Sequence, residues 1–232
     1  MPEIKPDNRP FSSLNYASRL KIASESRHRA IEIWSGCDAV ALSSLMGPMG
    51  DGPEWPSGPS WLALNRGGRA CIMSDGLSDP WVEKDRPNNG LGLEVYVEVA
   101  DLAIPNDTNL DSLSDTWLFP MMAEISHTLA TYPKLCDRLR NNETLLMRLN
   151  IEHIKDGRGL VGMLLHRPPF EPFRLATPNG GFQLIVATLL TQQEVAFLKG
   201  RGEKGRLQLL EALTQVNRAG ISLCNRESVA LV

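Results

Sequence analysis

One stretch of the sequence decides the fold: Leu91-Gly92-Leu93-Glu94-Val95-Tyr96-Val97-Glu98-Val99. Five apolar residues alternate along it with four residues of other kinds, without a break. Side chains of a strand point alternately to opposite faces, so the apolar set lies on one face and the set with Glu94 and Glu98 on the other. The alternation predicts a strand with one buried and one solvated face, in an antiparallel or mixed sheet.

Further strand signals lie on both sides of this stretch. Arg66-Gly67-Gly68-Arg69 and Pro178-Asn179-Gly180-Gly181 each join two apolar runs and are typical of hairpin turns. The other predicted strands are 60–65, 70–74, 145–151, 159–165, 173–177, 182–188, 221–224 and 228–232.

Four helices are predicted between and around the strands. Apolar residues recur at helical spacing in 16–34 and in 115–131, where Pro120 suits the first turn. Thr191-Gln192-Gln193-Glu194 is a capping box that opens a third helix, and the glycine-rich stretch 200–205 separates it from a fourth. The apolar face of the fourth helix comprises Leu207, Leu209, Leu210, Leu213 and Val216. Because hairpins recur and strands do not alternate strictly with helices, the fold class is α+β: a single domain with a mostly antiparallel or mixed sheet packed by helices.

The chain's composition is that of an ordinary globular protein, with 232 residues, 42% of them hydrophobic and 22% charged. Residues 1–15 carry three prolines and are predicted to be a loose arm, while 16–232 form the domain. The four cysteines form no C-x-x-C pair, and the amino terminus lacks the apolar run of a secretion signal. No stretch approaches the roughly 20 apolar residues of a membrane span, so we expect a cytoplasmic protein without membrane contact.

Charge is unevenly distributed along the chain. Residues 75–124 contain eleven acidic and two basic residues, a charge of −9, whereas the whole chain carries −3. An acidic window repels nucleic acid and could attract a basic partner. A solvated acidic surface without a partner is the alternative interpretation.

No motif in the sequence indicates a reaction, a metal or a cofactor. Residues 200–205 match G-x-G-x-x-G, but a helix precedes them where a dinucleotide site needs a strand. The histidines His28, His127, His153 and His166 form no metal-binding motif, and G-x-S-x-G is absent. We therefore predict no catalytic residue, no metal and no cofactor. A hydrolase that uses His153 and a remote acid remains an alternative.

Several segments, in order, resemble the suppressor of fused domain family. Ile72-Met73-Ser74-Asp75-Gly76-Leu77-Ser78-Asp79-Pro80-Trp81 resembles the family signature, in which a strand runs into Gly-Leu-Ser-Asp and an aromatic residue. Gly90 to Val97 is similar to its glycine-rich strand, although Leu91 and Leu93 replace the family's aromatic residues. Further similar segments are 116–120, 163–165, 177–181, 190–194, 205–213 and 221–231, so that the likeness is clearest over 59–232.

The resemblance implies an α+β interaction domain without a catalytic centre. Animal members of the family bind a transcription factor with the help of a second domain, for which this chain has no room. Bacterial single-domain members are thought to include immunity proteins that neutralise toxins, and we prefer this interpretation. It predicts a non-enzymatic domain that binds a protein partner, for which a basic toxin domain is one candidate, and no nucleic acid. A regulatory scaffold domain that binds a host protein is a further alternative.

A partner-binding face is predicted where the Pro/Gly-rich segment 47–59 meets the loop 75–81. Trp55 and Trp81 are of the type enriched at interface hot spots. The acidic side chains Asp75, Asp79, Glu83 and Asp85 would surround them, and Ser78 would help to hold the loop. The alternative is that both tryptophans belong to the core and that Ser78 and Asp79 hold the loop for folding alone.

Overall fold

A mixed sheet of eight strands forms the centre of the molecule. The computed structural model describes residues 10–42, 54–102, 110–151, 160–170 and 172–229. The strands are β1 Val40–Leu42, β2 Trp61–Arg66, β3 Arg69–Ser74, β4 Leu93–Val99, β5 Leu145–Leu149, β6 Val161–His166, β7 Arg174–Leu175 and β8 Phe182–Leu190. Their order is β1-β2-β3-β4-β8-β6-β5, with β7 paired to β8. The pair β4–β8 is parallel and the other described pairs are antiparallel, which confirms the predicted α+β class with a mixed sheet.

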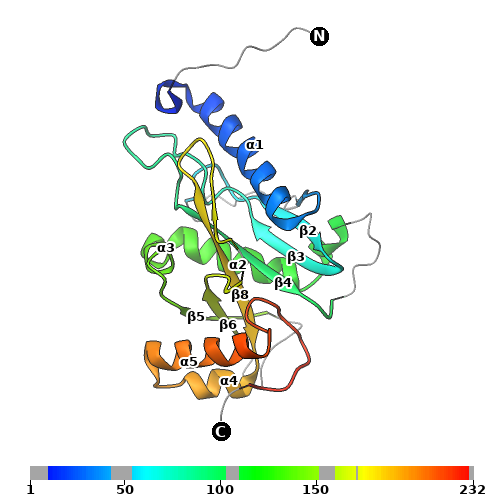
Figure 1. Ribbon diagram of the computed structural model, residues 1–232. Helices are drawn as coiled ribbons and strands as arrows, with labels where there is room; N and C mark the ends of the chain where they lie inside the picture. The colour runs from blue at the N-terminus through cyan, green and yellow to red at the C-terminus, as the bar shows by residue number, and fades with distance from the viewer. Residues whose placement is uncertain (1–9, 43–53, 103–109, 152–159, 171, 230–232) are drawn as a thin grey trace.

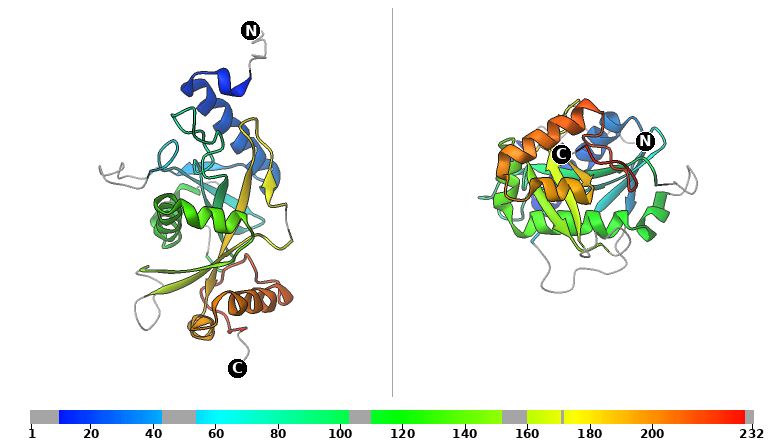
Figure 2. Two further views of the ribbon diagram at one scale, coloured as in Figure 1. Left: turned by 90° about the vertical axis from the view of Figure 1, so that its left-hand side faces the viewer. Right: turned by 90° about the horizontal axis from the view of Figure 1, so that it is seen from below.

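Helices cover both faces of this sheet (Figures 1 and 2). The helices are α1 Tyr16–Ser35, α2 Leu118–Thr131, α3 Pro133–Arg140, α4 Gln192–Leu198 and α5 Gly202–Gln215, with short 3-10 turns at Phe11–Ser13 and Leu110–Asp115. Strand β8 shows the layering, because Ile185 packs in the core beneath α2 while Leu184 packs in the core beneath α1. Leu190 shares the side of Leu184 and packs beneath α5. Helix α1 and the pair α4–α5 therefore cover the same face at opposite ends, and α2 with α3 covers the other face.

The predicted solvated face of β4 is wrong. Every residue from Leu93 to Val99 is buried, and Glu94 and Glu98 are 0% and 2% exposed. The alternation is real, but α1 covers the second face. Glu98 forms ion pairs there with Arg66, at 2.5 Å, and with Arg69.

The remaining local predictions were partly correct. Helix α1 and the capping box of α4 are confirmed, and α2 begins at Leu118. Pro133, two residues beyond the predicted helix 115–131, begins the unpredicted helix α3. The strand predicted at 221–224 is absent: within the described residues it is a single bridge between Val99 and Ser222. Residues 228–229 are not a strand either, while 230–232 lie outside the described residues.

The described helices include none with the length and apolar character needed to cross a bilayer.

Candidate functional site

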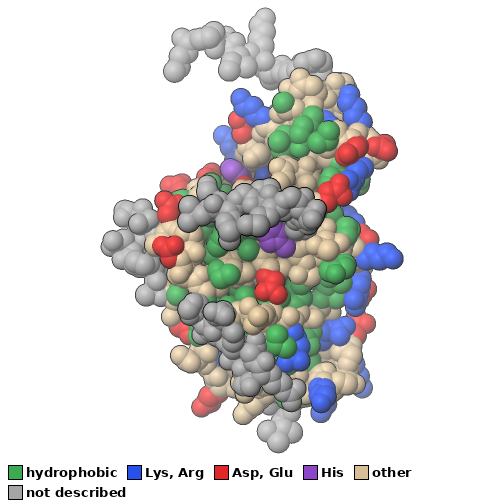
Figure 3. All heavy atoms as spheres, turned by 180° about the vertical axis from the view of Figure 1, so that it is seen from behind, with side chains coloured by type: hydrophobic (Ala, Val, Ile, Leu, Met, Phe, Trp, Pro, Cys, Tyr) green, Lys and Arg blue, Asp and Glu red, His purple; other side chains and the backbone are tan. Residues whose placement is uncertain are grey.

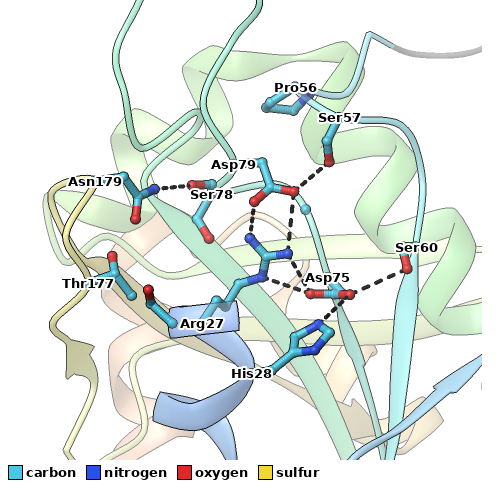
Figure 4. A network of polar contacts seen from close by, with 12 residues as sticks. Arg27, His28, Pro56, Ser57, Ser60, Asp75, Ser78, Asp79, Thr177 and Asn179 are labelled. Atoms are coloured by element: carbon cyan, nitrogen blue, oxygen red, sulfur yellow. Dashed lines mark hydrogen bonds and ion pairs between the residues drawn. The ribbon is translucent and has the colours of Figure 1, made fainter. Parts of the chain in front are cut away.

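The side chain of Arg27 lies inside the molecule among three carboxylates, of which Figure 4 shows Asp75 and Asp79. It is 2% exposed, and its Nε donates to Asp75 Oδ1 at 2.7 Å. It also forms an ion pair and hydrogen bonds with Asp79, and its Nε lies 3.8 Å from Glu94 Oε1. These carboxylates raise the pKa of Arg27 against the opposing effect of burial. A buried cation needs such partners, because an unpaired buried charge is very costly.

Helix α1 positions this arginine. Its N-cap Asn15 accepts a hydrogen bond from Ser18 N, and its buried side consists of Arg19, Ala23, Arg27 and Ile31, each four residues after the last. Arg19 Nη2 donates to the carbonyls of Trp81 and Val82, each at 3.1 Å. The two buried arginines of α1 therefore hold both ends of the signature loop, residues 74–82.

Glu94 holds the middle of the same loop. Its Oε1 accepts from Gly76 N at 3.1 Å and from Ser78 N and Oγ at 2.9 and 2.7 Å. Burial raises the pKa of Glu94 to about 7, although Arg27 and the hydrogen bonds from Ser74 and Ser78 oppose this shift. Gly76 adopts φ +134°, and a Cβ there would lie 2.9 Å from Ser57 Oγ, so the turn requires glycine.

His28 connects this network to solvent. Its side chain is 37% exposed, and its Nε2 lies 2.9 Å from Asp75 Oδ2. The hydrogen bond to Asp75 raises the pKa of His28. Burial would raise the pKa of Asp75, but Arg27 and His28 together lower it to about 2. His28 also lines a groove of about 710 Å³ between α1 and Ala176 and Pro178 of the β7–β8 hairpin.

The network has the parts of an acid–base site but not their arrangement. A serine nucleophile must hydrogen-bond to its base, and the base to an acid. Here Ser57 Oγ donates to Asp79, and Ser60 Oγ donates to Asp75 rather than to His28. Both serine hydroxyls therefore donate their hydrogen bonds to carboxylates and not to His28.

The β7–β8 hairpin closes the signature loop from the other side. Asn179 Nδ2 donates to the carbonyls of Ser78 and Asn88, each at 3.1 Å, and Asn89 Nδ2 donates to Gly181 O at 2.9 Å. The loop is thus fixed by α1, β4 and the hairpin together.

The structure places most of the predicted partner-binding residues inside. Trp55 and Trp81 are 6% and 4% exposed and belong to the core, as the structural alternative expected. Trp55 packs edge-on against Trp61, with ring centroids 5.7 Å apart, and Arg86 covers Trp81. The expectation of exposed tryptophan anchors is therefore wrong.

The acidic and polar members of the predicted face divide into two groups. Asp75, Ser78 and Asp79 are buried within the network, whereas Glu83 and Asp85 are exposed. Residues 47–53 of the predicted segment lie outside the described residues. Binding of a partner near Glu83 and Asp85 stays a prediction.

Sequence reasoning missed Arg19, Arg27 and Asn179. The available signal for the arginines was their spacing with Ala23 and Ile31, which places all four on one side of a helix.

Among the histidines outside the network, His166 is buried in the sheet. Burial lowers the pKa of His166 to about 4, and its Nε2 lies 3.0 Å from Thr188 Oγ1. His153 lies outside the described residues. Within the described part of the chain, no group of three or more His, Cys, Asp or Glu side chains is arranged to hold a metal ion.

Comparison with known proteins shows the fold. No protein-family model and no curated protein matches the sequence. A chain in the crystal structure of the Sufu–Fu complex matches with a TM-score of 0.56 and 14% identity, over 89% of this chain and 92% of the other. A structure described as a suppressor of fused homologue from Neisseria gonorrhoeae FA 1090 matches at 0.55 and 12% identity, over 90% of this chain and 98% of that one. Suppressor of fused from Drosophila matches at 0.54 and 14% identity, and the chain spans 51% of its length. The chain therefore has a suppressor of fused-like fold.

Proposed function

We propose, from its suppressor of fused-like fold, that this chain is a non-enzymatic domain that binds a partner protein. The likeness to a chain of the Sufu–Fu complex, over 89% of this chain, carries the proposal. The polar network supports it, because its hydroxyls and carboxylates hold one another and the signature loop in place instead of meeting at a reacting centre.

The finer form of the proposal is an immunity-type protein that neutralises a toxin by direct binding. The sequence resemblance to bacterial single-domain members motivates it. The match to 98% of the Neisseria gonorrhoeae chain agrees with a single-domain architecture.

The acidic window 75–124 gives less support to a basic partner than its sequence suggested. Four of the acids in 75–124, namely Asp75, Asp79, Glu94 and Glu98, are buried and paired with Arg27, Arg66 or Arg69. On the face covered by α2, acidic side chains are scattered among basic and apolar ones (Figure 3). The proposal that the toxin domain is basic therefore depends on the exposed acids alone, such as Glu83 and Asp85.

The test is affinity capture with the tagged full chain from the lysate of its own host, followed by mass spectrometry. We expect one protein to be recovered in stable, roughly equimolar amounts and to bind again when both partners are purified. Absence of any such partner under varied salt and pH would overturn the proposal.

Co-expression then tests the immunity form. If the captured partner is a toxin, it should stop growth when it is expressed alone. Co-expression of the chain should then restore growth. A captured partner that does not affect growth would favour the regulatory scaffold alternative instead.

A further inference from the structure

A groove of about 720 Å³ lies between α5 and the segment that follows β6. Pro168, Pro169 and Phe170 form one wall. The other wall is one side of α5, since Leu207, Leu210, Glu211 and Thr214 are spaced three, four and seven residues from the first. In Figures 1 and 2, α5 lies at the end of the molecule opposite α1, so the groove is separate from the Arg27 network.

Large apolar side chains remain exposed at this groove. The apolar face predicted for α5 divides in two: Leu209 and Leu213 pack on the sheet, whereas Leu207, which lines the groove, is 48% exposed. Phe170 is 66% exposed on the opposite wall. Exposed apolar side chains that gather around a hollow are typical of interaction sites.

Two arginines give the groove a positive end. Arg167 and Arg174 lie 4.8 and 5.7 Å from the ring centroid of Phe173, which lines the groove. Neither forms an ion pair among the residues that the structure describes, and Arg167 Nε is buried there without a hydrogen-bond partner. Burial and the neighbouring charge of Arg174 lower the pKa of Arg167. Arg167 Nη2 donates to the carbonyl of Arg140, which fixes the guanidinium in place.

We propose that this groove binds a segment of a partner protein in which a carboxylate stands beside a bulky apolar side chain. The carboxylate binds at Arg167 and Arg174, and the apolar side chain enters between Phe170 and Leu210. Guanidinium groups recognise carboxylates through two parallel hydrogen bonds, so the position of the charge is specific.

A protein segment fits this site better than a small molecule does. Small-molecule sites bury most of their ligand, whereas both walls here carry half-exposed apolar side chains. Aromatic residues and arginine are enriched at protein interfaces. Among the described lining residues the one acid is Glu211, which is exposed on α5 and selects against a second carboxylate on that wall. This inference rests on the proposed function and specifies the partner's chemistry.

Selection from a phage library of random 12-residue peptides on the immobilised full chain tests the groove. We expect peptides that combine Asp or Glu with Leu, Phe or Trp to be enriched. Phe170→Ala and Arg174→Glu should each weaken binding of a selected peptide by about 10-fold or more, as for interface hot spots. A peptide with Lys in place of its acid should regain affinity for Arg174→Glu.

Matched controls are available on distant surfaces. Tyr132 is 60% exposed at the junction of α2 and α3, and Arg29 is exposed on α1. Tyr132→Ala and Arg29→Glu should leave binding unchanged, and thermal melts should show that all four variants are folded.

Three results would overturn the inference: no enrichment, enrichment of basic peptides, or binding that Phe170→Ala and Arg174→Glu leave unchanged. A native partner that is captured equally well by the Phe170→Ala variant would also exclude this groove as its binding site, while the proposed protein-binding function would stand. Failure to capture any native partner would count against that function, and the peptide selection would still decide about the groove.

Discussion

At the scale of single residues, Glu94 is stabilised inside the protein by partners from outside its own strand. A glutamate on the second side of an apolar strand indicates a solvated face unless a cation reaches it inside the protein. Arg27 approaches Glu94 from α1, and Ser74 and Ser78 donate hydrogen bonds to it. The strand's own sequence contains no trace of these partners. The burial of Glu94 therefore depends on α1 and on the signature loop.

The pair His28–Asp75 makes folding depend on pH. The pKa of His28 is raised in the folded protein above its ordinary 6.5 by the hydrogen bond to Asp75. Charged His28 therefore stabilises the fold fully below pH 6.5, and this contribution is lost as the pH rises through the raised pKa. We predict that His28→Gln lowers the free energy of unfolding more at pH 5.5 than at pH 9, as measured by urea denaturation.

Other groups near His28 titrate as well, so the comparison must be between variants. Glu94, whose pKa is raised to about 7 from 4.5, makes the wild-type protein lose stability between these values as the pH rises. Arg27, whose pKa is raised by its carboxylate partners, stays charged throughout this range. An equal effect of His28→Gln at both pH values would contradict the role assigned to the histidine.

At the scale of elements, local signals predicted α1 and α4, which carry clear caps, and failed for β1 and α3. Helix α1 has an Asn15 cap and ends at Gly36 in the left-handed conformation, and α4 has a complete capping box, so each signal was in the sequence. Strand β1 has three residues and is defined only by its pairing with β2. Helix α3 begins at Pro133. Its start was missed because proline is common both at the first helical position and just beyond a helix end, so this signal is ambiguous.

The C-terminal segment is held to α4 by one buried ion pair. Arg226 binds both carboxylate oxygens of Glu194, at 2.5 and 2.6 Å, and Glu194 is 0% exposed. Glu194 also accepts from Thr191 N and Val229 N, at 2.9 and 3.0 Å. We predict that Arg226→Ala destabilises the protein by about 3–5 kcal/mol, because it leaves a buried carboxylate without its cation.

Urea denaturation of Arg226→Ala beside Arg218→Ala measures this effect. Arg218 is a half-exposed arginine in the same part of the chain, with no ion pair among the described residues, and its replacement should cost little. Adding Glu194→Gln to Arg226→Ala should recover part of the loss, since no unpaired charge remains. If the two arginine variants are equally mild, Arg226 does not hold this segment.

At the scale of the whole molecule, the two faces of the sheet are stabilised differently. The face beneath α2 is continuously apolar, whereas α1 reaches the opposite face with only Ala23 and Ile31 as fully buried apolar residues. Its other buried residues are Arg19 and Arg27. Trp34 adds an edge-on contact with Tyr96, with centroids 5.0 Å apart. Composition and periodicity predict the first kind of packing, since it follows from apolar residues alone. The second kind depends on charges far apart in the sequence, which explains why the polar network could not be predicted.

This asymmetry predicts that α1 separates from the sheet when its central charge is removed. Burial of Ile31 contributes roughly 1.5–3 kcal/mol, whereas removal of a buried cation from among its carboxylates costs about 3–5 kcal/mol. In Arg27→Ala the loss therefore exceeds the largest single apolar contact of the helix, but it stays below the roughly 5–15 kcal/mol that stabilise a whole domain. We expect hydrogen exchange measured by mass spectrometry to show faster exchange throughout Tyr16–Ser35, while β4 and β8 keep their protection.

Arg29→Ala, two residues farther along the same helix and exposed, should leave the exchange of both α1 and the two strands unchanged. Equal loss of protection in α1 and β4 would mean that the network stabilises the sheet as much as the helix. Unchanged exchange in α1 would mean that its apolar contacts suffice, and either result would contradict a helix held mainly by charge.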